Sequence, residues 1–136
     1  MFKRLRRMRL NPNIREMLTE TTLSKKDLIY PLFITHGSGV KNPIESMPEV
    51  YQLSIDEALK ECEVLQKLGI FSILLFGIPK IKDSVGSEAL SQEGIIAQAT
   101  RAIKEKFPDL LVCVDLCFCE YTDHGHCGIL SPKLNS

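Results

Sequence analysis

The hydrophobic pattern after residue 54 alternates between helical and extended periodicity, and few folds accommodate that alternation. Behind a capping box predicted at Ser54, apolar residues recur at helical spacing over 55–68, and Gly69 ends the predicted helix. The following stretch, 71–76, is almost wholly apolar. Such composition is expected of a parallel strand that is covered on both faces.

The alternation repeats once more toward the carboxyl end. A second apolar stripe at helical spacing covers 95–107 and stops at Pro108, and a further strand is predicted over 110–118. An earlier strand is predicted over 29–34. The order strand, helix, strand, helix, strand predicts right-handed crossovers and a parallel sheet in an α/β fold.

The amino-terminal segment differs in character from the rest of the chain. Six basic residues precede the first acidic one: Lys3, Arg4, Arg6, Arg7, Arg9 and Arg15. A short helix is predicted with Asn11 as N-cap and Pro12 at its first position, and a capped turn is predicted at Ser24. We therefore predict an arm over 1–27, a folded domain over 28–130 and a divergent tail over 131–136.

Charge and cysteine content limit the class of protein. Lys plus Arg and Asp plus Glu both number 17, so the charge balance predicts neither nucleic acid nor a membrane surface as a partner. No apolar run approaches the roughly 20 residues of a membrane helix, and the basic segment is not followed by an export signal. Four of the five cysteines lie between Cys113 and Cys127. This spacing favours a metal cluster in a reducing, cytoplasmic compartment over a disulfide framework.

Side chains along the predicted strand 110–118 alternate between an apolar face and a reactive face. Asp115, Cys117 and Cys119 share the reactive face, at the carboxyl end where β/α-barrels carry their active sites. The loop that follows contains Gly125 and is long enough to return Cys127 to the same place. Three thiolates suit a soft or borderline ion, and zinc is the metal that we predict.

Two alternatives to an open, chemically active zinc site remain. His124 or His126 can supply a fourth ligand, which would make the site a closed structural one. The cysteines can also be buried free thiols, because cysteine often packs as a small hydrophobe. We assign Cys62 and Cys113 to such packing.

The segment 115–128 closely resembles the metal-binding segment of the zinc-type porphobilinogen synthases, also called 5-aminolevulinate dehydratases. Further motifs match in family order at 30–33, 46–48, 75–79 and 86–89, together with the basic residues of 4–7. The resemblance extends to about Leu130. It implies a TIM (β/α)8 barrel, of which this chain holds about the first three βα units behind the basic arm.

The resemblance also implies a function. Enzymes of this family are lyases that condense two 5-aminolevulinate molecules to porphobilinogen, on the route to haem and other tetrapyrroles. By position, Cys117, Cys119 and Cys127 match the zinc ligands and Asp115 matches an active-site aspartate. The two loop histidines match residues beside the ligands. In this family the amino-terminal arm wraps a neighbouring subunit in a homo-octamer. The resemblance is also compatible with magnesium at a separate site.

Much of the family pattern has no counterpart in 136 residues. The Schiff-base lysines match no position here, and the tail with Lys133 departs from the family's continuation. We therefore expect a truncated chain that is inactive alone. The alternative is a non-catalytic zinc-binding or subunit-interaction fragment.

Overall fold

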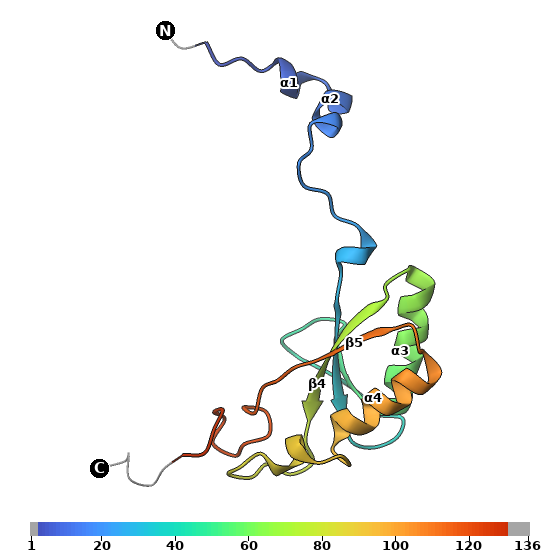
Figure 1. Cartoon of the computed structure of the whole chain (residues 1–136), viewed down its shortest axis with the longest axis vertical. Helices are drawn as coiled ribbons and strands as arrows, with labels where there is room; N and C mark the ends of the chain where they lie inside the picture. The colour runs from blue at the N-terminus through green and yellow to red at the C-terminus, as the bar shows by residue number, and fades with distance from the viewer. Residues whose placement is uncertain (1–2, 131–136) are drawn as a thin grey trace, which may run out of the picture.

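The computed structural model of the chain describes residues 3–130 and contains a five-stranded sheet. The strand order is β2-β3-β1-β4-β5, and every pairing is parallel except that of β2 with β3. Figure 1 shows the labelled elements. The strands are β1 (Tyr30–Thr35), β2 (Lys41–Pro43), β3 (Tyr51–Leu53), β4 (Ser72–Ile78) and β5 (Leu111–Val114).

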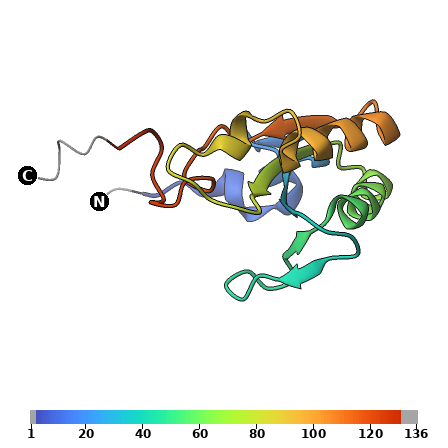
Figure 2. The same cartoon turned by 90° about the horizontal axis from the view of Figure 1, so that it is seen from below.

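Two long helices cover one face of this sheet. They are α3 (Ile55–Leu68), which contacts β1 and β3, and α4 (Ile95–Lys106), which contacts β1, β4 and β5. The helices also contact each other, and Figure 2 shows them side by side. The core forms between helices and sheet from thirteen buried residues: Leu32, Ile34, Leu53, Ala58, Cys62, Leu65, Ile73, Leu75, Ile95, Ala99, Ile103, Phe107 and Leu110.

The opposite face of the sheet carries half-buried side chains. Phe33 of β1 and Phe76 of β4 are paired in register, and their rings stack with centroids 5.2 Å apart. Cys113 of β5 pairs with Leu74 on the same side. The parallel arrangement predicted from the sequence is therefore confirmed for β1, β4 and β5. The predicted end of α3 at Gly69 is also confirmed, and this residue has a φ of 78°.

The segment before residue 28 extends away from the sheet (Figure 1). It contains α1 (Arg7–Leu10), α2 (Pro12–Met17) and the 3₁₀ turn η1 (Lys25–Asp27), and none of these has a buried residue. Asn11 caps α2 through the N–H of Asn13, and Ser24 and Asp27 form a capping box, as the sequence predicted. The helix α1 was not expected.

Three local expectations were wrong. The strands β2 and β3 were missed, because each has only three residues and β2 is exposed and contains Pro43. Ser54 is the N-cap of α3 without a side-chain capping bond, because its hydroxyl bonds Val40 and Asp56 instead. The strand predicted over 110–118 ends at Val114.

No helix among residues 3–130 is long and apolar enough to cross a bilayer. The tail expected over 131–136, including Lys133, lies outside the described residues.

Candidate metal centre

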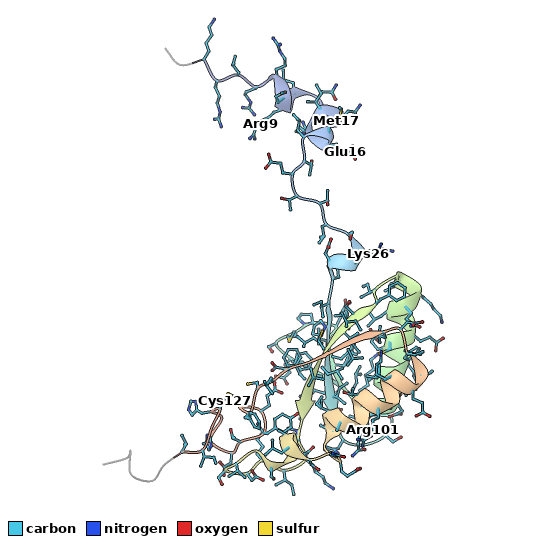
Figure 3. All side chains as sticks on the ribbon, in the orientation of Figure 1. Arg9, Glu16, Met17, Lys26, Arg101 and Cys127 are labelled. Atoms are coloured by element: carbon cyan, nitrogen blue, oxygen red, sulfur yellow. The ribbon has the colours of Figure 1, made fainter. Side chains whose placement is uncertain are left out.

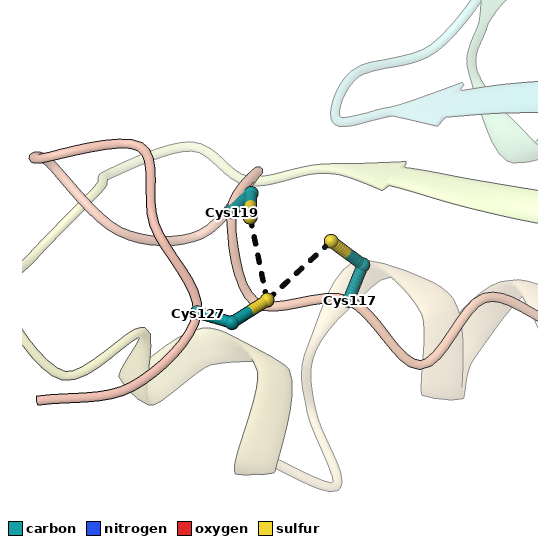
Figure 4. A group of neighbouring side chains, drawn as sticks. All are labelled: Cys117, Cys119 and Cys127. Carbon is teal, nitrogen blue, oxygen red and sulfur yellow. Dashed lines mark hydrogen bonds between the residues drawn. The ribbon is translucent and has the colours of Figure 1, made fainter.

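Three cysteine sulfurs meet just beyond the carboxyl end of β5. The Sγ atoms of Cys117, Cys119 and Cys127 all lie within 4.8 Å of one another (Figure 4). Cys127 Sγ is 3.7 Å from Cys117 Sγ and 3.3 Å from Cys119 Sγ. The sequence predicted this convergence, and the structure brings the three thiols together.

The route by which the first two cysteines meet differs from the one expected. The last backbone hydrogen bond between this segment and β4 is the one that Asp115 N–H donates to Leu75 O, at 3.2 Å. The chain is no longer a strand at Cys117 and Cys119, so the alternation of side chains along a strand does not explain how these thiols meet. Instead the chain turns at Phe118, whose carbonyl accepts from the N–H groups of Tyr121 at 2.9 Å and Thr122 at 3.0 Å. Cys119 lies inside this turn, and the turn places the sulfur of Cys119 near that of Cys117.

A second loop delivers the third thiol. Gly125 has a φ of 72°, a left-handed conformation that costs glycine little, and it lets the chain reverse before Cys127. The hydroxyl of Thr122 donates to His126 O at 2.9 Å and closes this return. The N–H of Phe118 donates to Cys127 Sγ at 3.3 Å, which fixes the thiol against the turn.

The spacing of these sulfurs fits a tetrahedral ion. Zn–S bonds of about 2.3 Å at tetrahedral angles put neighbouring sulfurs about 3.8 Å apart. The Sγ–Sγ distances of 3.3 and 3.7 Å from Cys127 are close to that value. Thiolates are ligands of soft or borderline metals, so the cluster can hold such an ion with little rearrangement.

The thiols also share protons unequally. Hydrogen bonding to Cys127, and then to Cys117, raises the pKa of Cys119 to about 11. The pKa of Cys127 is lowered, first by the bond with Cys119 and then by the N–H of Phe118. Cys127 therefore carries negative charge more readily than Cys119, and a cation that binds here must displace a proton from Cys119.

Neither loop histidine joins the group of mutually close ligand atoms found in the described chain. His124 Nε2 lies 3.3 Å from Ser84 O, and His124 Nδ1 accepts from the N–H of His126 at 3.3 Å. Their rings stack with centroids 6.2 Å apart. This arrangement does not supply the fourth ligand of a closed site.

Two charged residues near the cluster were not singled out from the sequence. Glu120 is half-buried, and burial, followed by the nearby charge of Asp115, raises its pKa, while Lys82 acts in the opposite direction. Glu120 and Lys82 line an open pocket of about 340 Å³ at the carboxyl ends of β1 and β4. Asp115 itself is exposed. Only the adjacency of Glu120 to Cys119 could have indicated its place.

Comparison with known proteins gives a consistent result. Residues 2–136 match the family model described as delta-aminolevulinic acid dehydratase. The Helicobacter pylori protein of that name is 62% identical over 131 residues, covering 96% of this chain and 41% of the relative. The one from Halalkalibacterium halodurans is 51% identical over 129 residues, covering 95% and 39%.

A solved structure agrees with the sequence comparisons. The delta-aminolevulinic acid dehydratase of Toxoplasma gondii, crystallised with its reaction product porphobilinogen, superposes with a TM-score of 0.91 at 31% identity. The match covers 100% of this chain and 39% of that one. The chain thus spans about 40% of the length of these relatives.

Proposed function

The chain belongs to the delta-aminolevulinic acid dehydratase family, and on that premise we propose that it forms the zinc-binding part of a porphobilinogen synthase. The reaction of the whole enzyme condenses two 5-aminolevulinate molecules to porphobilinogen in tetrapyrrole synthesis. One observation carries the proposal: three sulfurs lie within 4.8 Å of one another beyond the carboxyl end of the parallel strand β5, in a chain of this family.

A partial TIM barrel is the architecture that we infer. The strands β1, β4 and β5 lie side by side in the sheet in the order in which the chain reaches them, and the helices α3 and α4 lie on one face. Doubly wound sheets place helices on both faces, whereas barrels keep them all outside. The inner face of such a barrel is the one that carries Phe33, Phe76 and Cys113.

The cysteines, in this proposal, hold zinc and leave one coordination position for a ligand. Zinc held there supplies a positive centre that orients and polarises a carbonyl or amine. The charge of Asp115 acts on Glu120, the residue next to Cys119, and Glu120, with its raised pKa, is able to carry a proton at a carboxyl oxygen. The pocket beside Lys82 gives a small substrate access to this edge of the sheet.

Metal content and turnover test the proposal together. The purified chain should contain zinc, and Cys119→Ala should lose it, since two thiolates bind a zinc ion far more weakly than three. Cys113→Ala is the matched control, because Cys113 lies on β5 outside the cluster and its loss should leave zinc content unchanged. Retention of zinc by Cys119→Ala would exclude the cluster as the metal site.

Turnover is expected only from a chain that also carries the remainder of the barrel. We expect 5-aminolevulinate to yield no porphobilinogen with residues 1–136 alone, since they span about 40% of the relatives' length. Formation of porphobilinogen by this chain would contradict that expectation.

A subunit-interaction role is the second candidate, and the amino-terminal segment favours it. The segment stands apart from the sheet and exposes six large apolar side chains: Leu5, Met8, Leu10, Met17, Leu18 and Leu23. A concentration of exposed apolar side chains often marks a site of contact with another protein. We propose a homo-oligomer held by this arm, and sedimentation of the chain with and without residues 1–27 tests it. An unchanged assembly state would count against the arm.

We also infer a reducing, cytoplasmic location. All five cysteines are unpaired, and the cluster binds metal only while its thiols stay reduced.

A further inference from the structure

The loop that follows β4 is joined to the cysteine loop by backbone hydrogen bonds at its middle. Asp83 N–H donates to Tyr121 O at 3.3 Å, and Asp123 N–H donates to Asp83 O at 3.1 Å. These two bonds form an isolated parallel bridge between Asp83 and Thr122. A segment 35 residues or more away in sequence therefore holds the centre of the loop that carries the thiols.

The side chain of Asp83 shapes the segment that makes this bridge. Its carboxylate accepts from the N–H groups of Val85 and Ser87, both at 3.0 Å, and from the hydroxyl of Ser87. These bonds, the hydroxyl first, lower the pKa of Asp83. An ionised carboxylate thus closes the turn over 83–87. The carbonyl of Asp83 accepts from Gly86 N–H at 3.4 Å inside this turn and from Asp123 N–H of the cysteine loop at 3.1 Å.

Close packing reinforces the bridge. Tyr121 is only 7% exposed, and a Cβ placed on Gly77 of β4 would lie 2.0 Å from its Oη. A Cβ on Gly86 would lie 3.3 Å from both Phe118 Cδ1 and Tyr121 Cβ. The two glycines therefore make room for the turn that contains Cys119.

Thr122 connects the bridge to the segment that carries the third thiol, that of Cys127. The residue is 2% exposed, and its hydroxyl donates to the carbonyl of His126, which immediately precedes Cys127. His124 approaches Ser84 O from the same loop. The contacts lead from the Asp83 turn through Thr122 to Cys127, and none of them involves a sulfur atom.

We propose that Asp83 and Thr122 are positioning residues that hold Cys127 beside the other two thiols before any metal binds. A loop closed in advance binds an ion with less loss of conformational entropy, and the groups behind metal ligands tune affinity in this way. The inference rests on the proposed metal centre for its metal-binding consequence only.

Paired variants of the whole chain test each residue. Thr122→Val removes the hydroxyl without changing the shape of the side chain, and Thr122→Ser restores the hydroxyl. Asp83→Ala removes the turn-forming carboxylate, and Asp27→Ala is its matched control. Asp27 likewise accepts hydrogen bonds that close a short 3₁₀ turn, but η1 lies far from the cluster, as Lys26 and Cys127 in Figure 3 show.

Two readouts separate positioning from metal chemistry. Cobalt(II) titration follows the thiolate-to-metal absorption band, and phenylarsine oxide measures, in metal-free chain, how readily one arsenic atom captures neighbouring thiols. Thr122→Val should weaken cobalt affinity about three- to tenfold, as expected for one lost buried hydrogen bond, and Asp83→Ala about tenfold or more. Arsenical capture should slow in the same order. Thr122→Ser and Asp27→Ala should stay within about twofold of wild type.

The two proposals fail in different ways. If wild type and both variants capture the arsenical equally fast, positioning is refuted whatever cobalt does. If wild type captures the arsenical faster than the variants but binds no cobalt, positioning stands and the metal centre is refuted. Circular dichroism and the urea midpoint of each variant show that the chain is folded. Asp83 is half-buried, so its replacement disturbs packing less than replacement of the buried Thr122 does.

Discussion

Replacing Gly77 with alanine adds a methyl group where the chain has no space for one. The new Cβ would lie 2.0 Å from Tyr121 Oη, 2.6 Å from Ile96 Cγ1 and 3.1 Å from Tyr121 Cζ. Gly77 does not have a positive φ, so alanine brings no backbone strain. Any loss of stability therefore comes from displaced side chains.

The size of the loss follows from how far the ring must move. Relieving a 2.0 Å contact requires a shift of more than about 1 Å, and overpacking of this kind costs about 1–3 kcal/mol. Complete expulsion of the Tyr121 ring forfeits its burial, which is worth a similar amount, about 1.5–3 kcal/mol. We expect Gly77→Ala to destabilise the chain by about 2–3 kcal/mol, which lowers the urea midpoint by about 1 M.

A double-mutant cycle identifies the side chain responsible. In a Tyr121→Ala background, the cost of Gly77→Ala should fall by at least about 1 kcal/mol, leaving only the contact with Ile96. Urea unfolding of the four proteins, followed by circular dichroism, measures this coupling. Equal costs in the two backgrounds would refute the idea that Tyr121 occupies the space above Gly77.

Three further outcomes are expected. Zinc affinity should rise with pH, because ligation displaces protons and hydrogen bonding to Cys127 raises the pKa of Cys119 to about 11; a pH-independent affinity in zinc titrations would argue against thiolate ligation. Leu75→Ala should lower the free energy of unfolding by about 2–5 kcal/mol, since this side chain is fully buried, and a loss in urea below about 1 kcal/mol would be inconsistent with that. The pKa of Asp56 is lowered, chiefly by the Ser54 hydroxyl, so the stabilisation from this carboxylate is present above its ordinary pKa of 3.8 and disappears as pH falls through the lower folded pKa. Asp56→Asn should flatten this part of an acid-unfolding curve. An unchanged curve would show that the bond contributes nothing.

Local signals explain what could be predicted of the fold. Hydrophobic periodicity located α3 and α4, and apolar runs located β1, β4 and β5, although the predicted end of β5 was four residues too late. The strands β2 and β3 have three residues each, and their existence depends on pairing with each other and with β1. The Ser54 hydroxyl was misassigned for a similar reason, since its partner Val40 is distant in sequence.

The candidate site divides in the same way. Cysteine spacing identified Cys117, Cys119 and Cys127 as a group, and the structure places their sulfurs together. Their role as metal ligands, and that of Asp115 in catalysis, stay predictions. The turn at Phe118 that brings Cys119 round was not predicted, because alternation suggested that the strand continued.

The sequence by itself determined the order of β1, α3, β4, α4 and β5, the family, and which three thiols form a group, since each of these depends on residues near one another in the chain. Only the tertiary structure decided where β5 ends, how Tyr121 occupies the space above Gly77, and that Asp83 holds the cysteine loop. These features are contacts between segments 35 or more residues apart. Their free energy is gained only when the sheet has brought both segments to the same edge, and no local pattern records it.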